Sequence, residues 1–347
     1  MTGVQTCALP IFWLTVIVGL ISIAVLVLSA DVAVTKLTGL AGFYRLSTTF
    51  VGVTVVSLAT SIPEIAAHFT ASVGILRGTL DYEISSAVVL GANIGSDVIQ
   101  QTLIMAIVIF IAGTLTFKRY FLWKTMLPMI LTTLMCIILG LDGTYSRIDG
   151  LILFGSFLAY VAFLYYDERK HYKEEDHGFT PEGELPEGVP ANGKEALRDA
   201  TIAVLAMVVT VASAMVALQA TEGIVENTGI SGSLIGVVTL GIASALPELI
   251  TAVSGIRKGD AGIPLGTLIG SNITNPLVAI GGGALISTYW VPDALVRWDL
   301  PLETLTGLLL WAILWFNKGD AGKKTAIYLT ILYFIFVTLR AVYFGVD

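Results

Sequence analysis

The sequence predicts an all-α integral membrane protein with ten transmembrane helices, and three observations support this prediction. Hydrophobic residues make up 55% of the 347 residues and charged residues only 13%, about half the charged share of a soluble domain. Apolar runs of roughly 20 residues, the length that crosses a bilayer, recur along the whole chain. Two motifs within these runs occur twice, once in each half. Together these features predict two inverted five-helix repeats.

Ten apolar runs define the expected transmembrane helices. Their approximate limits are 12–30, 47–76, 85–113, 122–141, 149–166, 200–220, 232–256, 262–287, 300–316 and 325–344. The second, third, seventh and eighth runs are the least apolar and the richest in Gly, Ser, Thr, Asn and Pro. Residues 1–11, "MTGVQTCALPI", resemble a translated sequencing adapter and lack the basic start of a signal peptide. We therefore expect this segment not to be native.

One soluble stretch, residues 167–199, separates the fifth run from the sixth. It is rich in acidic residues and proline, so we expect a solvated, mostly disordered linker. The chain then divides into a first repeat (1–166), the linker, and a second repeat (200–347). Because each repeat holds an odd number of helices, the second enters the membrane in the opposite orientation, as an inverted repeat requires.

The distribution of Lys and Arg predicts the orientation. If the loops alternate sides, one side holds 15 of the 19 basic residues, including those of the linker. The other side holds Arg77, Arg147, Arg297 and Arg340. The positive-inside rule places the richer side in the cytoplasm. We therefore expect a multi-pass plasma-membrane protein with a cytoplasmic linker and both termini outside.

Composition also excludes several functional classes. The sequence has no basic patch of the kind that binds nucleic acid, and its two cysteines and three histidines form no zinc pattern. The acid in "NIGSD", Asp97, has no second acidic motif to pair with, and no nucleophile–His set or HExxH motif occurs. We therefore predict no enzymatic activity and no cofactor.

A first motif recurs in the second and seventh runs. "VGVTVVSLATSIPE" (51–64) aligns with "IGVVTLGIASALPE" (235–248), so that Pro-Glu pairs end both segments, at Glu64 and Glu248. A carboxylate near the bilayer centre costs at least a few kcal/mol unless it is neutralised. A bound cation or a proton would neutralise each one.

A second motif recurs in the third and eighth runs. "GANIGSDVIQQ" (91–101) aligns with "GTLIGSNITNP" (266–276), which matches Ser96 with Ser271. A repeated Pro-Glu followed by a repeated Ile-Gly-Ser is hard to obtain by chance. Internal repeats with interrupted helices at matching positions point to a transporter site near the membrane midplane.

Proline should break both Pro-Glu helices. Pro63 and Pro247 have no N–H, and each ring displaces the carbonyl four residues back. Carbonyls around 57–60 and 241–244 are then expected to lose their donors and to face a cation. Irregular backbone at membrane depth is tolerated only where it is buried in protein or lines a wet cavity.

The third and eighth runs would supply further oxygen ligands. Ser96 and Gln100 are four residues apart and share a helix face, and Ser271 and Asn275 repeat that spacing. Carboxylates, hydroxyls, amides and carbonyls form an all-oxygen set. Such a set suits Ca²⁺ or Na⁺, whereas zinc and copper prefer His and Cys.

The two Gly/Ala-rich segments that end in Pro-Glu, each followed by G-x-x-[IV]-G-S, resemble the alpha repeats of the cation/calcium antiporter superfamily. The prokaryotic sodium/calcium exchanger-like branch is the most similar. The resemblance implies ion sites between the second, third, seventh and eighth helices, with Glu64 and Glu248 as central acidic ligands. It also implicates the hydroxyls of Thr60, Ser61, Ser244, Ser96 and Ser271, the side chains of Gln100 and Asn275, and the carbonyls of Ser57 and Gly241.

The chain departs from the family pattern in two ways. Ala245 lacks the hydroxyl that Ser61 keeps, and Gln100 and Asn275 stand where exchangers usually carry Asn or Asp. Only two matched carboxylates remain, which one Ca²⁺ or two protons would balance. The sequence therefore leaves the coupling ion open between Na⁺ and H⁺.

Two ionisable residues near the motifs have no counterpart in the other half. Asp97 points about 100° away from the Ser96 face of its helix, so we expect its partner outside the main site. His68 lies one turn beyond Glu64 and aligns with Ala252, so we expect a structural role, with a proton relay to Glu64 as the alternative.

The sequence thus predicts a secondary active antiporter that exports Ca²⁺ in exchange for Na⁺ by alternating access. The first and sixth helices would slide against the core to switch access. The alternatives are a proton-coupled exchanger for Ca²⁺ or another divalent cation and, less favoured, a passive cation channel. Inorganic cations and the bilayer are the expected partners, and a monomer is compatible with the sequence.

Overall fold

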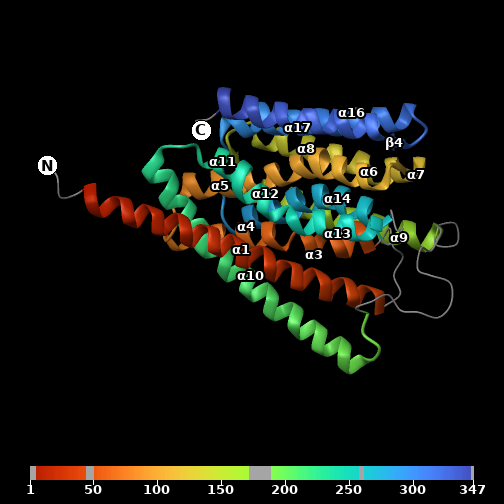
Figure 1. Cartoon of the computed structure of the whole chain (residues 1–347), viewed down its shortest axis with the longest axis horizontal. Coiled ribbons are helices and arrows are strands. Elements are labelled where there is room, and N and C mark those ends of the chain that lie inside the picture. Colours follow the sequence, from red (N-terminus) through yellow and green to blue (C-terminus); the bar gives the residue numbers. More distant parts are fainter. Residues whose placement is uncertain (1–4, 44–50, 172–188, 258–261, 345–347) are drawn as a thin grey trace.

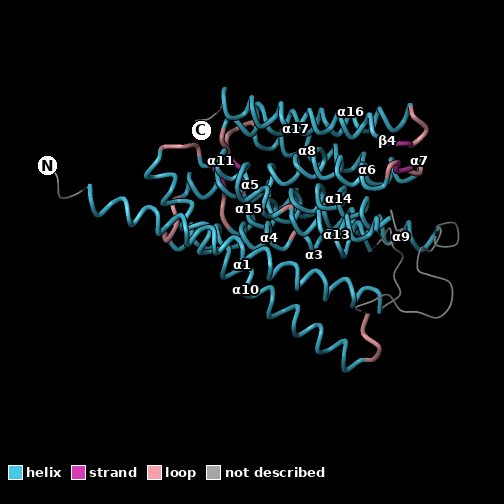
Figure 2. The backbone as a smooth tube through the Cα atoms, viewed as in Figure 1, coloured by secondary structure: helices cyan, strands magenta, loops and turns pink. Residues whose placement is uncertain are grey.

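The computed structural model describes residues 5–43, 51–171, 189–257 and 262–344. Most of the helices run side by side along the long axis of the molecule, with α1 and α10 lying obliquely across one face (Figure 1). Helix extends over almost the whole described chain (Figure 2). The all-α membrane fold predicted from the sequence is confirmed.

The first half begins with a long helix and continues through segments in which π-helical turns, labelled η, alternate with α-helix. Its elements are α1 (Gln5–Phe43), η1 (Val51–Val56), α3 (Ser57–Thr60), α4 (Ile62–Arg77), α5 (Tyr82–Ile99), η2 (Gln100–Ile104), α6 (Met105–Ala112), β1 (Thr114–Thr116), α7 (Arg119–Phe121), η3 (Leu122–Met126), α8 (Leu127–Gly140), β2 (Thr144–Tyr145) and α9 (Arg147–His171).

The second half repeats this order. Its elements are α10 (Gly193–Thr228), α11 (Gly232–Ile235), η4 (Gly236–Leu240), α12 (Gly241–Ser244), α13 (Leu246–Arg257), α14 (Gly262–Thr274), η5 (Asn275–Ile280), α15 (Gly281–Ile286), β3 (Tyr289–Trp290), η6 (Leu295–Asp299), α16 (Leu300–Phe316), β4 (Asp320–Gly322) and α17 (Lys323–Tyr343).

Nine helical segments of the described chain are long and apolar enough to cross a membrane. They are Trp13–Ala33, Tyr82–Ala112, Arg119–Gly140, Arg147–Asp167, Gly193–Thr228, Gly232–Arg257, Leu265–Ile286, Leu295–Phe316 and Lys323–Tyr343. The tenth expected run, 47–76, coincides with the interrupted segment from η1 to α4, and its residues 47–50 lie outside the described residues. Helices α1 and α10 exceed their predicted limits because hydropathy marks only the apolar part of a helix.

The π-helical turns occupy matching positions in the two halves. η1 and η4 lie on the aligned segments that precede the Pro-Glu pairs, and η2 and η5 begin at the aligned residues Gln100 and Asn275. η3 and η6 each end directly before a Leu-Pro pair. Such turns are rare and concentrate at functional sites. The two halves therefore share one pattern of backbone irregularities.

Glycines bring the crossing helices into backbone contact. A Cβ added to Gly95 of α5 would lie 2.6 Å from Cα of Val237 in η4. A Cβ on the equivalent Gly270 of α14 would lie 2.8 Å from the carbonyl oxygen of Val53 in η1. Small residues allow this close approach between membrane helices. The four helices that carry the motifs are therefore locked together by two matching crossings.

Two short antiparallel ribbons, which the sequence did not predict, join the loops of the two halves. β1 pairs with β4, and β2 pairs with β3. The loops after α6 and α16 therefore lie at one end of the molecule, and the loops after α8 and α15 lie together as a second pair. This pairing agrees with the alternation of loops that the charge distribution assumed.

The linker prediction is partly wrong. α9 continues to His171, and α10 already begins at Gly193, where the Asn192 side chain accepts hydrogen bonds from the first backbone N–H groups. Asp167 forms an ion pair with Lys124 at 2.7 Å, and Asp199 with Lys36 at 3.2 Å. Both ends of the linker are thus helical and tied to the first half. Residues 172–188 lie outside the described residues.

Candidate cation site

The predicted helix breaks are present directly before both glutamates. α3 ends at Thr60, and Ser61 adopts φ −77° and ψ 5° before α4 begins with Pro63 in its first turn. Ala245 adopts φ −79° and ψ −3° at the matching place. Because proline cannot donate the next helical hydrogen bond, the chain turns here and restarts. Each glutamate therefore sits in the first turn of a new helix.

Glu64 is buried and bonded through one oxygen. Ser96 Oγ donates to Glu64 Oε1 at 2.7 Å, and Gln100 Nε2 donates to Ser96 Oγ at 3.0 Å. The Ser244 hydroxyl, which comes from the helix break of the other half, also interacts with the Glu64 carboxyl group. Glu64 Oε2 has no hydrogen-bond partner. The predicted residues Ser96, Gln100 and Ser244 are thus brought together around Glu64.

Glu248 has a matching environment. Ser271 Oγ donates to Glu248 Oε1 at 3.3 Å, and Thr60 Oγ1 lies 3.2 Å from Ser271 Oγ. Thr60, from the first helix break, also interacts with Glu248 itself. Glu248 Oε2 is likewise buried and unpartnered. Each glutamate therefore contacts the serine of its own half and a hydroxyl from the helix break of the other half.

The carbonyls at the breaks behave differently from the prediction. The Ser57 carbonyl accepts from Ser61 N at 3.0 Å and from Thr60 Oγ1 at 3.2 Å. The Gly241 carbonyl accepts from Ala245 N and from Ser244 Oγ, both at 3.3 Å. The expectation that these two carbonyls lose their donors is wrong, because the residues that form each turn still close a local hydrogen bond.

Ser61 is the exception among the hydroxyls at the breaks. Its Oγ is fully buried and has no hydrogen-bond partner in the structure. A buried hydroxyl without a partner is costly, and such a group calls for a specific explanation. Ser61 lies three residues before Glu64, whose Oε2 is also unpartnered, so its free oxygen is compatible with a ligand role.

Asp97 contacts a residue of the predicted site, contrary to expectation. Asn275 Nδ2 donates to Asp97 Oδ1 at 2.7 Å, and Asn93 Nδ2 donates to the Asn275 carbonyl at 3.2 Å. The 100° offset from Ser96 turns Asp97 toward η5, which packs against α5, rather than away from the site. The prediction that its partner lies outside the main site is therefore wrong.

His68 contacts Tyr289 rather than Glu64. Its Nδ1 lies 3.2 Å from Tyr289 Oη, which donates to the His68 carbonyl at 3.0 Å and lies 2.6 Å from Ser72 Oγ. These bonds join α4 to the β2–β3 ribbon through Tyr289, which is fully buried. The surroundings of His68 agree with the structural role expected for it.

Several buried polar residues of the site region were missed by sequence reasoning. Asn272 Nδ2 donates to Gln100 Oε1 at 3.1 Å, and Gln101 Nε2 donates to Asn272 Oδ1 at 2.7 Å. The same Gln101 nitrogen reaches Glu303 Oε1 of α16 at 3.2 Å. Asn272 aligns with Asp97, and Glu303 is an acid within an apolar run, so the signals were present in the sequence.

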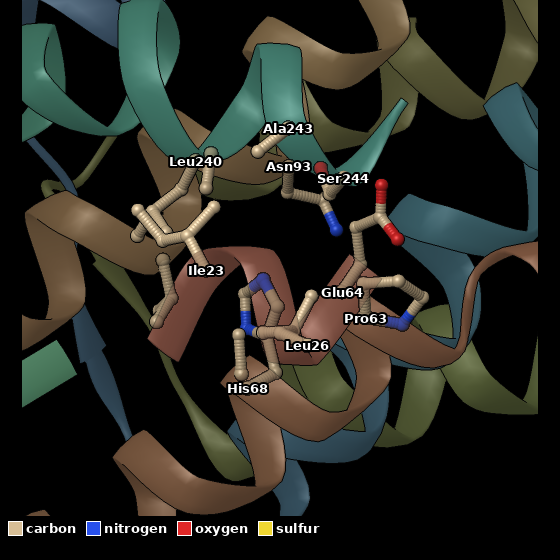
Figure 3. Close-up of a pocket in the computed structure, with 12 residues that line it drawn as sticks. Ile23, Leu26, Pro63, Glu64, His68, Asn93, Leu240, Ala243 and Ser244 are labelled. Carbon is tan, nitrogen blue, oxygen red and sulfur yellow. The ribbon is translucent and has the colours of Figure 1, made fainter. Parts of the chain in front are cut away.

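A small, partly open pocket reaches Glu64 between the first turns of α4, the middle of α5, α1 and the segment from η4 to α12. Figure 3 shows Glu64, His68, Asn93 and Ser244 at its edge, with Ile23 and Leu26 of α1 across from them. Most of the remaining lining is apolar. The pocket therefore places one of the two glutamates beside space that α1 borders.

The donor set is one of oxygen atoms. In the residues that the structure describes, no group of three or more His, Cys, Asp or Glu side chains gathers as a metal cluster. Hydroxyls and amides supply the remaining ligands beside the two carboxylates, which suits hard cations. Inverted helical repeats with acids at matched helix breaks define a membrane transporter of such cations.

Comparison with known proteins agrees with this class. The profile of the family described as "Sodium/calcium exchanger protein" matches residues 14–166 and 200–342, and the chain belongs to this family. The CaxA protein of Alkalimonas amylolytica, whose name describes it as an antiporter, is 30% identical over 271 residues, 77% of this chain and 79% of CaxA. Inner membrane protein YrbG of Escherichia coli (strain K12) is 26% identical over 311 residues, 90% of this chain and 92% of YrbG.

Two solved exchangers share the fold. The sodium-calcium exchanger NCX_Mj superposes with a TM-score of 0.62 at 20% identity, covering 94% of this chain and 99% of that protein. The H⁺/Ca²⁺ exchanger CAX superposes with a TM-score of 0.72 at 17% identity, covering 94% and 86%. Together with the family match, this fold makes the chain a multi-pass membrane exchanger, a secondary transporter rather than an enzyme.

Proposed function

We propose that this protein exports Ca²⁺ from the cytoplasm in exchange for Na⁺ by alternating access. The observation that carries the proposal is the matched pair Glu64 and Glu248. Each is buried at a helix break, each is bonded to one serine, and each keeps one oxygen unpartnered. One Ca²⁺ would balance both charges, and Na⁺ entering overlapping ligand positions would displace it.

Beside these two carboxylates we propose a set of neutral oxygen ligands. They are the hydroxyls of Thr60, Ser61, Ser96, Ser244 and Ser271, the amide side chains of Gln100 and Asn275, and the carbonyls of Ser57 and Gly241. The two carbonyls would have to release their local hydrogen bonds to bind an ion, whereas Ser61 Oγ is already unpartnered. We expect the hydroxyls to bind more strongly than these carbonyls.

Helices α1 and α10 are the proposed moving elements. They pack side by side across the helix breaks (Figure 1). Alanine makes up most of their fully buried contacts with α4: Ala33 and Ala206 pack with Ile62, and Ala214 and Leu26 pack with Ala66. Because few large side chains interdigitate there, the pair can slide over the core.

We further propose that residues 1–166 and 200–347 form the two repeats, with the linker cytoplasmic and both termini outside the plasma membrane. The ion pairs of Lys36 and Lys124 with the ends of the linker support a shared side for these groups. A cysteine at Ile230 should react with an impermeant thiol reagent in intact cells, and one at Asn317 only after permeabilisation. The reverse pattern would invert the orientation.

Proton coupling is the second candidate, favoured by the neutral amides at positions 100 and 275. With only two carboxylates in the proposed set, two protons balance the site as well as one Ca²⁺ does.

Flux into proteoliposomes tests both candidates. An inward Na⁺ gradient, with choline as the control cation, should drive Ca²⁺ movement, and a pH gradient alone should not. The substitution Glu64→Gln should abolish the driven flux. Movement that follows only the pH gradient would establish proton coupling, and an ohmic current without countertransport would establish a channel. Driven flux that survives Glu64→Gln would refute the proposed site.

A further inference from the structure

A further buried acid lies on α16, outside the helices that carry the proposed Ca²⁺ site. Glu303 is 1% exposed. Its Oε1 accepts hydrogen bonds from Thr133 Oγ1 at 2.9 Å and from Gln101 Nε2 at 3.2 Å, whereas its Oε2 is buried without a partner. Three helical segments, η2, α8 and α16, therefore converge on a carboxyl group that is only half satisfied.

No positive side chain in the described part of the chain forms an ion pair with this group. Within the described ranges, the ion pairs that form involve Asp167, Asp199, Asp293 and Asp299, and none reaches Glu303. The nearby Asp97 adds further negative potential. A buried carboxylate without a counter-charge is strongly disfavoured. A proton or a bound cation would neutralise the charge.

A second oxygen is available beside Glu303. Gln101 uses its amide nitrogen for both Asn272 and Glu303, and its Oε1 is left buried and unpartnered. Gly307 lies one turn beyond Glu303 on α16, and a Cβ there would approach Gln101 Oε1 to 3.4 Å. The Met129 and Ile130 side chains pack at the same place, each 3.2 Å from that Cβ position, so Gln101 Oε1 is buried close to the α16 backbone.

We propose that Glu303, Gln101 and Thr133 form a second cation site, selective for Na⁺. One carboxylate with two neutral oxygens is a hard donor set of low charge, which balances a monovalent ion better than Ca²⁺. Asn272 connects Gln101 to Gln100 and hence to Ser96 and Glu64 through successive hydrogen bonds. An ion at Glu303 would therefore influence the orientation of the amides that face the main site.

The proposed site belongs to one half only. The Leu-Pro pairs that open α8 and α16 align Glu303 with Ile130, which offers no oxygen. The main site would be formed by matching residues of both halves, whereas the Glu303 site would have no counterpart in the first half. The inference deepens the proposed Na⁺ coupling and rests on it for its use in transport, but binding at Glu303 can be measured without any transport.

Na⁺ binding to purified protein tests the proposal. In a variant carrying Glu64→Gln and Glu248→Gln, which disables the main site, Na⁺ should still raise the melting temperature relative to choline. Adding Glu303→Gln should remove this shift. Adding Glu226→Gln, at an acid on α10 far along the chain from the site, is the control and should leave the shift in place.

Equilibrium binding of ²²Na⁺ to the otherwise unaltered protein is the second measurement, which serves if the double variant does not fold. Glu303→Gln should lower the bound Na⁺ by one per chain. Undiminished binding in this variant, or an equal shift with Glu303 replaced, would overturn the proposal. If Glu303→Gln changes only the pH dependence of Ca²⁺ exchange and not Na⁺ binding, the Glu303 carboxyl group binds a proton or a water molecule instead of Na⁺, and the proposal fails. Failure of Na⁺-driven flux with intact Na⁺ binding would count against the proposed function alone.

Discussion

The two halves of the molecule share a backbone but not a charge distribution. Their helix breaks, at Ser61 and Ala245, have nearly the same φ and ψ. Their π-helical turns and their glycine crossings, at Gly95 and Gly270, also match. Duplication has preserved the features that shape the helices. This matching geometry is what two halves need if they are to exchange roles between two access states.

The side chains around that backbone differ. When the two halves are aligned, Asp97 corresponds to Asn272, Glu303 to Ile130, and Ser61 to Ala245. The serine bond to the carboxylate is 2.7 Å at Glu64 and 3.3 Å at Glu248. This comparison suggests a division of roles. The backbone that the two halves share would allow the change between access states, and the side chains that differ between them would select the ions.

The largest expected effect tests whether the central acids are equivalent. Glu64→Gln and Glu248→Gln should each lower Ca²⁺ transport in proteoliposomes by more than about 100-fold, because each removes a charge that binds the ion directly, and outer groups alone cost 10- to 100-fold. Unchanged thermal stability would separate this loss from misfolding. If one variant retained most of its transport, the two halves would not share one ion.

The next effect tests the matching crossings. Gly95→Ala and Gly270→Ala should each destabilise the protein by about 1–3 kcal/mol, because the new methyl group meets backbone that cannot move aside. Gly282→Ala is the matched control, since a Cβ there meets nothing within 4 Å. Thermal unfolding in detergent measures all three. A strong effect at only one crossing would show that the halves are held together unequally.

The smallest expected effect concerns the hydroxyl present in only one half. Ser61→Ala should weaken apparent Ca²⁺ affinity by about tenfold, the lower end of the range for groups around a metal site, because the hydroxyl carries no charge. Ala245→Ser should shift affinity in the opposite direction or not at all, since a second hydroxyl makes the halves alike. Concentration-dependent ⁴⁵Ca²⁺ uptake measures both. An equal loss in the two variants would mean that packing, not ligation, governs this position.

Much of this protein was determined by its sequence alone. Apolar runs fix membrane spans because the bilayer sets their length, and proline fixes the breaks because it lacks an N–H. The duplicated Pro-Glu and Ile-Gly-Ser motifs indicated the candidate site. In the structure, Ser96 bonds to Glu64 and Ser271 bonds to Glu248.

Tertiary structure decided what local pattern could not express. The bond between Asp97 and Asn275 depends on how α5 crosses η5. The hydrogen bonds of Glu303 with Gln101 and Thr133 depend on three segments that are far apart in the chain. The strand ribbons arise only when loops of opposite halves meet. Sequence periodicity indicates which face of a helix is polar. Long-range packing decides which residue lies across that face, and it therefore also decides which charges surround each ion.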